Sequence, residues 1–283
     1  MEGSMKSLFD TLSYQCSEQV TNLYSTSFSI AVRTLSVKIR GSILAIYGFV
    51  RLADEIVDSF HDYNQAVLFE ELENDLQNAI DHRISLNPIL NAFQDVVHKY
   101  DIDLDLVHAF MKSMKADLHK QKYESKEEYE GYIYGSADVV GLMCLKVFVQ
   151  GNQKQYDKLK CSAMKLGSAF QKVNFLRDLK DDTELLQRSY FPQLKSGLLD
   201  ENTKNEIVEE IKTDFEEAYV GIKQLPVEAK FGVYTAYVYY SKLLNKLEKI
   251  DAKEIKERRV RISNPLKIRL LTKSFVQFKL NML

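Results

Sequence analysis

Ala45-Ile-Tyr-Gly-Phe-Val-Arg-Leu-Ala-Asp-Glu-Ile-Val-Asp58 is the stretch that decides the fold prediction. At about 100° per residue, a helix here gathers its polar side chains into one stripe roughly 60° wide. The stripe consists of Tyr47, Arg51, Asp54 and Asp58. Most of the other residues are apolar, so the helix is expected to be buried. Buried carboxylates without partners are costly, so the two aspartates must meet metal ions or cationic side chains.

A second helix of the same character is predicted at Gln171-Lys-Val-Asn-Phe-Leu-Arg-Asp-Leu-Lys-Asp-Asp182. Its polar stripe, about 80° wide, consists of Gln171, Asn174, Asp178 and Asp182. Both stripes offer oxygen ligands and neither a thiolate nor an imidazole, which indicates Mg²⁺ rather than zinc or copper. One stripe alone is more typical of a solvated face with ion pairs to an arginine such as Arg177. Two stripes in apolar helices favour a metal site.

Two such helices that faced each other could hold several Mg²⁺ ions and, through them, a diphosphate. Metal ions and arginines would neutralise the charge on a departing diphosphate. The bond broken would be a carbon–oxygen bond, which leaves an allylic carbocation. Such a cation needs shielding from water and is stabilised by aromatic faces. The chain has 16 Tyr and 15 Phe, enough to line an apolar tunnel.

The rest of the chain predicts an all-α protein. Only four Pro and eleven Gly interrupt its 283 residues, and good helix formers fill long stretches. Helices are expected at about 10–26, 37–60, 65–82, 88–99, 103–120, 126–149, 153–188, 201–223, 227–250 and 264–282. No linker or repeat divides them, so residues 1–283 are predicted to form a single domain. Residues 1–4, before Met5, are interpreted as a cloning remnant.

The charge and the cysteine content indicate which binding partners and which cellular compartment to expect. The net charge of −2 predicts no nucleic-acid binding. From Ala252 onward, however, nine Lys or Arg and two Glu give a net +7. This tail, with its apolar positions, is expected either to rest on an anionic membrane or to pack on the core with its cations outward. Those positions are Leu266, Leu270, Phe275 and Phe278. A cytoplasmic protein is predicted, because the three cysteines are scattered and the sequence has neither a secretion signal nor an apolar run near 18 residues. The alternative is a cytoplasmic protein with peripheral membrane contact.

The two acidic motifs, Asp54-Glu-Ile-Val-Asp58 and Asn174-Phe-Leu-Arg-Asp-Leu-Lys-Asp-Asp182, resemble those of the squalene/phytoene synthase family. The resemblance extends to other segments in the same order. These are Tyr24-Ser-Thr-Ser-Phe-Ser29, the helix from Tyr132 to Met143, Arg188-Ser-Tyr-Phe-Pro192 and Tyr239. One departure is Ser136-Ala-Asp-Val-Val-Gly141, where the family commonly has V-A-G-T-V-G. The Asp138 there is expected to alter helix packing or the pocket wall.

The resemblance implies an isoprenoid-synthase helical bundle around a central cavity. It implies Mg²⁺, two or three ions bound through diphosphate, with Asp54, Asp58, Asn174, Asp178 and Asp182 as ligands. Residues expected to bind substrate are Ser25, Ser27, Phe28, Tyr47, Arg51, Gln171 and Tyr239. The catalytic set is expected to be the four motif aspartates with Tyr132 and Arg177, and Asp117 resembles a further family acid.

The reaction that the resemblance implies is a prenyl transfer in two steps. Two geranylgeranyl diphosphates condense head to head through a cyclopropyl (prephytoene) diphosphate into phytoene, and NADPH is not expected. The alternative is a squalene or dehydrosqualene synthase that uses two farnesyl diphosphates. A class I terpene cyclase is a weaker alternative, because the second motif of such enzymes usually carries Ser and Glu where this chain has Asp178 and Asp182. A non-catalytic assembly factor is also weaker, because all four motif aspartates and both arginines are intact.

Overall fold

The computed structural model describes residues 5–184, 188–194 and 199–280, and it is helical throughout. Within these ranges the extended pairing is a single isolated parallel bridge between Lys122 and Ser189. The all-α prediction is confirmed. The elements are α1 (Met5–Tyr24), α2 (Thr26–Arg33), α3 (Val37–Asp58), α4 (Gln65–His82), α5 (Pro88–Tyr100), α6 (Leu104–Ala116), α7 (Lys126–Ile133), the π-helical η1 (Tyr134–Asp138), α8 (Val139–Phe148), α9 (Gln153–Glu184), α10 (Glu201–Ile222), α11 (Val227–Lys249), α12 (Ala252–Glu257) and α13 (Asn264–Lys279).

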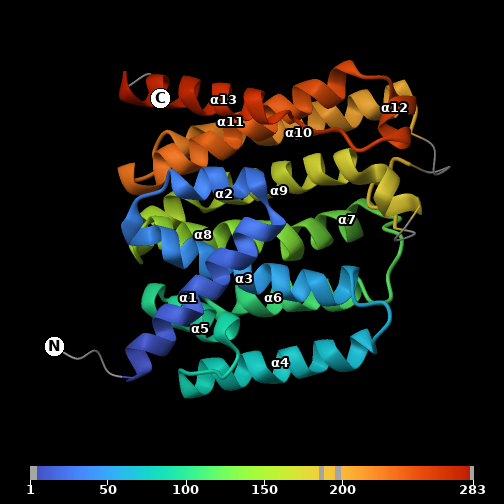
Figure 1. Cartoon of the computed structure of the whole chain (residues 1–283). Helices are drawn as coiled ribbons and strands as arrows, with labels where there is room; N and C mark the ends of the chain where they lie inside the picture. Colours follow the sequence, from blue (N-terminus) through green and yellow to red (C-terminus); the bar gives the residue numbers. More distant parts are fainter. Residues whose placement is uncertain (1–4, 185–187, 195–198, 281–283) are drawn as a thin grey trace.

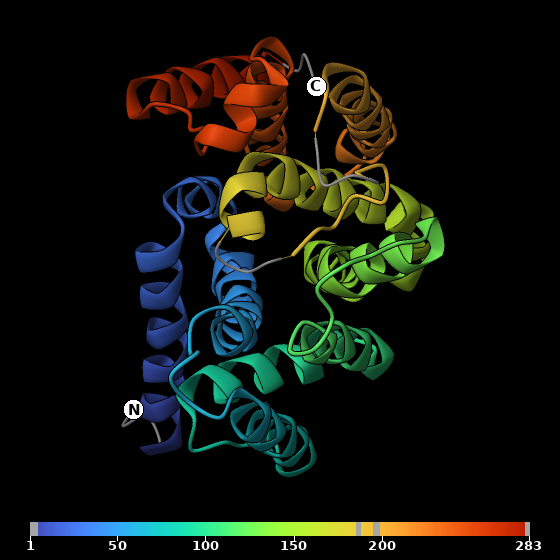
Figure 2. The same ribbon diagram turned by 90° about the vertical axis from the view of Figure 1, so that its right-hand side faces the viewer.

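The helices are stacked in tiers, with α10, α11 and α13 at one end and α4 at the other (Figures 1 and 2). The long helix α9 crosses the middle of the stack, and α3 lies below it in the view of Figure 1. One hydrophobic core joins α3, α4, α5, α6 and α8, and a second joins α7, α9, α10 and α11. Helix α3 belongs to the first core and the acidic part of α9 to the second, so the space between the two acidic stripes lies between the cores.

Most predicted helices are confirmed, with three differences. Helix α2 was not predicted, since the first expected helix ended at residue 26; the Ser25 hydroxyl oxygen accepts a hydrogen bond from the Phe28 N–H and starts this new helix. The predicted helix 126–149 contains the π-helical turn η1, and the short α12 was not predicted. The interpretation of residues 1–4, and the predicted helix ends at 185–187 and 281–282, lie outside the described residues.

Lys126–Phe148 is the run in the described chain that is long and apolar enough to span a bilayer by length and composition. The sequence analysis had recognised no such run. The most apolar 18 residues have a mean hydropathy of 1.2 and are 56% buried inside the protein. The run includes α7, η1 and α8, which contact α6 and α9. It therefore has the surroundings of a core helix.

Two glycines let α8 and η1 approach α9 closely. A Cβ atom on Gly141 would lie 2.9 Å from the Ala163 carbonyl oxygen, and one on Gly167 would lie 2.8 Å from that of Ala137. Both separations are too short for a side chain, because the obstacle is backbone. Backbone approaches backbone here, and this contact fixes the part of α9 that leads into its acidic stripe.

Helix α13 packs on α11 with part of the predicted apolar stripe inward. Phe278 stacks on Phe231 with ring centroids 5.1 Å apart, and the Tyr234 hydroxyl lies 3.1 Å from the Gln277 side-chain oxygen. Leu266 and Leu270 are half-buried. These contacts agree with the packed alternative. The outward face carries other apolar residues, and it is considered under the proposed function.

Asp138 lies in η1, where its carboxylate accepts a 2.7 Å hydrogen bond from the Ser168 hydroxyl of α9. It is buried, and it is not part of the wall of either cavity described below. The expectation that Asp138 affects helix packing therefore fits its position better than an effect on the pocket. Burial raises the pKa of Asp138 to about 6, although Ser168 and Lys172 favour the charged form.

This raised pKa predicts a pH-dependent loss of stability. Between pH 4 and 6 the folded protein keeps a proton on Asp138 that the unfolded chain has lost, so the free energy of unfolding falls as pH rises. The loss is at most roughly 3 kcal/mol, from a difference of about two pKa units. Asp138→Asn cannot ionise, so its stability relative to the wild type should increase between pH 4.5 and 7.5. Urea denaturation at both pH values measures this, and an unchanged difference would contradict the account.

Candidate active site

Helix α3 presents its aspartates to a cavity because its other faces are committed to the core. Phe49 and Ala53 are fully buried, whereas the Asp54 and Asp58 side chains keep 33% and 29% of their surface exposed. The helix ends at Asp58, where its last carbonyl groups have partners. The Gln65 side-chain amide donates to the carbonyl oxygens of Ile56 (2.7 Å) and Val57 (3.2 Å). The end of α3, which carries the first stripe, is thus held by a side chain from α4.

Helix α9 presents the second stripe in the same way. Val173 and Leu176 are fully buried, whereas the Asp178 side chain is 18% exposed. Arg177 pairs with Asp178 through two nitrogen–oxygen contacts. The Asn174 side-chain oxygen accepts a 3.3 Å hydrogen bond from the Tyr240 hydroxyl of α11. Both stripes therefore lie on helices whose orientation is fixed by packing on their opposite sides.

The two stripes line one cavity of about 770 Å³. Every residue that the sequence analysis placed in the site lies on its wall. These are Ser25, Ser27, Phe28, Tyr47, Arg51, Asp54, Asp58, Tyr132, Gln171, Asn174, Arg177, Asp178, Asp182 and Tyr239. Asp117 also lines it. The predicted residues are thus brought together, while the roles expected for them stay predictions.

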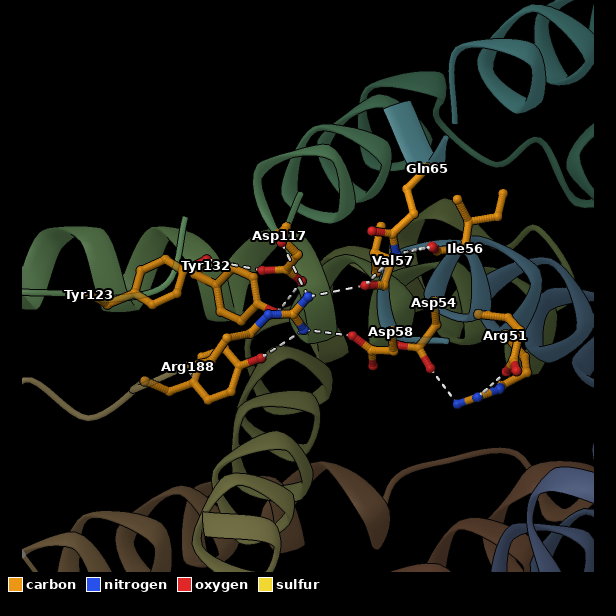
Figure 3. A network of polar contacts seen from close by, with 12 residues as sticks. Arg51, Asp54, Ile56, Val57, Asp58, Gln65, Asp117, Tyr123, Tyr132 and Arg188 are labelled. Carbon is orange, nitrogen blue, oxygen red and sulfur yellow. Dashed lines mark hydrogen bonds and ion pairs between the residues drawn. The ribbon is translucent and has the colours of Figure 1, made fainter. Parts of the chain in front are cut away.

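Arginines pair with carboxylates of the site (Figure 3). Arg51 contacts Asp54 one turn away on α3, and it also pairs with Glu55. Arg188 reaches Asp58 at 2.6 Å, and its backbone N–H donates to the Asp182 carbonyl oxygen at 2.8 Å. Arg188 therefore ties the end of α3 to the end of α9.

A smaller polar cluster lies beside this tie. The Tyr132 hydroxyl donates to Asp117 at 2.6 Å, and the Arg188 guanidinium donates to the Asp117 backbone oxygen at 3.2 Å (Figure 3). Tyr190 stacks on Tyr132 with ring centroids 5.3 Å apart. Burial, followed by the charge of Asp117, raises the pKa of Tyr132 well above its usual value, so its hydroxyl keeps its proton.

Mutual repulsion among the carboxylates shapes the electrostatics. Burial, and then the charges of Asp178 and Asp58, raise the pKa of Asp182 to about 8. Burial, and then the charge of Asp58, likewise raise the pKa of Asp54 above its usual range. Within the described chain Asp182 has no ion-pair partner. The cavity therefore gains from any cation placed between the two helices.

The donor set fits Mg²⁺ that is bound jointly with a diphosphate. The stripes supply only oxygen ligands, the type that Mg²⁺ takes, and Mg²⁺ is usually held by one or two carboxylates with substrate phosphates. In the described ranges no three Asp, Glu, His or Cys side chains converge as a ready metal cage. Further oxygen ligands, such as those of a phosphate, would have to complete the coordination of an ion here.

A second, apolar cavity of about 300 Å³ adjoins the first. Residues from α2, α3, α8, α9, α10 and α11 line it. Phe28 and Tyr47, stacked with centroids 4.7 Å apart, belong to the walls of both cavities. On α9 the lining runs from Asn174 to Leu159, about 22 Å at 1.5 Å per residue. The arrangement can hold a polar head in one cavity and a long apolar chain in the other.

Several cations of the site were not predicted from the sequence. Arg259 pairs with Asp178 at 2.8 Å, and Lys267 donates to the Thr26 hydroxyl at 3.0 Å. Arg188, Arg259, Arg261 and Lys267 all line the polar cavity. The net charge of +7 from Ala252 onward could have indicated the three cations from that tail, but those side chains were expected to face a membrane or the solvent. With these residues the cavity wall has six Lys or Arg against five Asp, which suits an anionic ligand that brings its own metal ions.

Comparison with known proteins identifies the family. The family described as squalene/phytoene synthase matches residues 21–196, which contain both carboxylate stripes. The chain therefore belongs to the squalene/phytoene synthase family. The 15-cis-phytoene synthase of Enterobacter agglomerans is 27% identical over 275 residues, 87% of this chain and 90% of that protein. The chloroplastic phytoene synthase 1 of Solanum lycopersicum is 26% identical over 88% of this chain, which spans 63% of the tomato protein.

Solved structures share the fold. A dehydrosqualene synthase in complex with a ligand has a TM-score of 0.80 at 21% identity, over 95% of this chain and 98% of that one. The squalene synthase HpnC from Alicyclobacillus acidocaldarius has a TM-score of 0.73 at 17% identity, over 88% and 95%. The predicted isoprenoid-synthase bundle is confirmed.

Asp178→Asn tests whether the second stripe acts as a charge site. The variant should lower the rate of Mg²⁺-dependent diphosphate release from a prenyl diphosphate by at least about 100-fold, because it removes a charge aimed at the reacting group. Circular dichroism should show unchanged helix content. Asp181→Asn is the matched control, since Asp181 lies on the same helix and outside the cavity wall, and it should keep wild-type activity. Near-normal turnover by Asp178→Asn would exclude the assigned role.

Proposed function

We propose that this chain is a Mg²⁺-dependent prenyltransferase that joins two geranylgeranyl diphosphates head to head into phytoene. The observation that carries the proposal is that α3 and α9 present carboxylates to one cavity, with an apolar cavity behind it. Members of the matched family are prenyltransferases. Relatives named phytoene synthase match over most of this chain, which supports the reaction class.

Residues of both stripes would hold Mg²⁺. The proposed ligands are Asp54, Asp58, Asn174, Asp178 and Asp182. Bound Mg²⁺ supplies positive charge against a departing diphosphate. The arginines that now pair with these aspartates would turn to phosphate oxygens once the carboxylates take the metal.

The other lining residues would bind and orient the two substrates. Ser25, which caps α2, together with Ser27 and Gln171, would make polar contacts to the phosphate oxygens. The aromatic residues proposed to line the reacting chains are Phe28, Tyr47, Tyr132 and Tyr239. Their faces, and the apolar cavity, would keep water from a carbocation.

The proposed chemistry has two ionisations. In the first, the carbon–oxygen bond of one diphosphate breaks and its electron pair leaves with the oxygen. The double bond of the second chain attacks the resulting cation, and loss of a proton closes the ring of a cyclopropyl diphosphate. In the second, the remaining carbon–oxygen bond breaks, and the cation rearranges and loses a proton to give the hydrocarbon. No hydride donor takes part in this sequence, so we propose that NADPH is not used.

A farnesyl-based reaction is the second candidate, because a dehydrosqualene synthase shares the fold at a TM-score of 0.80. The 22 Å of cavity lining along α9 supports the longer chain. Purified protein with Mg²⁺ and geranylgeranyl diphosphate should give a C40 hydrocarbon, and chelation of Mg²⁺ should abolish it. A C30 product from farnesyl diphosphate alone would contradict the proposed substrate, and a cyclic C15 or C20 terpene would contradict the reaction class.

We also propose that the protein is cytoplasmic and contacts the membrane peripherally. The outward face of α13 carries Ile268, Val276 and Leu280 beside Arg269 and Lys273, and the described residues from 258 to 280 include no acid. An apolar face with cations suits an anionic bilayer. Co-sedimentation with phosphatidylglycerol vesicles but not phosphatidylcholine vesicles is expected, and equal recovery with both would reject the contact.

A further inference from the structure

The far end of the apolar cavity is formed by large buried side chains. Leu145 of α8, Leu159 of α9 and Ile222 of α10 line it, with 1%, 4% and 3% of their surface exposed. On α9 the lining runs from Asn174, which also lines the polar cavity, to Leu159. Leu159 is therefore the lining residue of α9 that lies farthest from the carboxylates.

Helix α8 runs antiparallel to α9 along this cavity, because the two close backbone contacts at Gly141 and Gly167 occur in reverse order on the two helices. The first of these contacts joins Gly141 to Ala163. Leu145 lies one turn beyond Gly141 on α8. Leu159 lies one turn before Ala163 on α9, so the two leucines share one level, about 6 Å beyond the contact.

Helix α10 runs antiparallel to α9 as well. Lys172 pairs with Asp214 at 2.6 Å. Earlier on α9, the Ser162 hydroxyl donates to the Glu217 carbonyl oxygen at 3.1 Å. Ile222 lies just over one turn beyond Glu217 on α10, so it reaches the level of the two leucines. The leucines and Ile222 together form the floor of the apolar cavity.

The depth of the cavity separates the reach of two prenyl chains. Asn174 lies about 16 Å from Ala163 and about 22 Å from Leu159 along α9, at 1.5 Å per residue. An extended farnesyl chain spans about 13 Å and a geranylgeranyl chain about 18 Å, at roughly 1.2 Å per main-chain bond. A farnesyl chain that enters at Asn174 therefore ends before Ala163, whereas the last isoprene unit of a geranylgeranyl chain must pass it.

Ala163 is the α9 residue one turn above the floor. It is half-buried, and it lines the cavity together with Gly141 of α8 and Ala218 of α10, which lie at the same level. None of the three carries more than a methyl group, so these walls leave this level of the cavity unfilled.

We propose that Ala163 selects for the geranylgeranyl chain by leaving room, one turn above the floor, for its last isoprene unit. This inference rests on the proposed function and names the residues that select the chain length. The floor stops a longer chain, so the cavity fits four isoprene units. Ala163 is in this account a specificity-determining residue and takes no part in the chemistry.

Ala163→Leu tests the proposal by filling this level. The variant should lower kcat/KM for geranylgeranyl diphosphate, relative to that for farnesyl diphosphate, by at least about 10-fold, because the larger side chain excludes the longer substrate. A general loss of folded protein would lower both values equally and leave their ratio unchanged. Cys161→Leu is the matched control, since Cys161 lies nearby on α9 but is exposed and outside both cavity walls, and it should keep the wild-type ratio.

Leu159→Ala tests the floor in the opposite direction. Removal of this side chain should raise kcat/KM for the C25 substrate geranylfarnesyl diphosphate, relative to that for geranylgeranyl diphosphate, by at least about 10-fold. No gain in this ratio would exclude Leu159 as the floor.

The substrate ratio in Ala163→Leu decides the proposal, and an unchanged ratio would overturn it. If the wild type converts no geranylgeranyl diphosphate, the proposed function fails. Binding of the unreactive geranylgeranyl and farnesyl S-thiolodiphosphates with Mg²⁺, measured by calorimetry, then decides the chain-length inference. A wild-type preference for the longer analogue that Ala163→Leu reverses would support the role of Ala163, and the same preference in both proteins would exclude it.

Discussion

The burial of aspartates that face one cavity, together with the repulsion among them, is the constraint on which the rest of the site depends. Asp54, Asp58, Asp178 and Asp182 come from two helices and share one cavity wall. Burial and neighbouring charge raise the pKa of Asp182 to about 8, so the folded protein holds this carboxylate at a cost. Arginines reduce that cost, and the site suits a ligand that brings cations of its own.

Packing and one arginine hold α3 and α9 in place although their aspartates repel one another. Each helix is buried on its outer side, and Arg188 joins their ends through the Asp58 side chain and the Asp182 backbone. The same guanidinium donates to the Val57 carbonyl oxygen at 3.3 Å, so it also satisfies the end of α3. The glycines at α8 and α9 add close backbone packing behind the second stripe. A frame of this kind keeps the charges directed at one cavity.

Sequence periodicity predicted the parts of the site that lie within one helix. The 3.6-residue repeat determines that Asp54 and Asp58 share a face, and that Asp178 and Asp182 do. It could not predict Arg188 or Arg259, because their aspartate partners are 130 and 81 residues away along the chain. Nor could it predict η1, because a π-helical turn changes the repeat by a single residue. The inward face of α13 was ambiguous for a similar reason, since Phe278 and Ile268 are both apolar and only packing on α11 separates them.

The central claim is that the two carboxylate stripes act together on one metal–diphosphate ligand. Crystals soaked with Mn²⁺ and inorganic diphosphate, measured at the manganese absorption edge, test this most directly. The account predicts anomalous peaks between α3 and α9, with ligands from Asp54 or Asp58 on one side and from Asn174, Asp178 or Asp182 on the other. Manganese bound to one helix alone, or at neither stripe while diphosphate occupies the cavity, would contradict it.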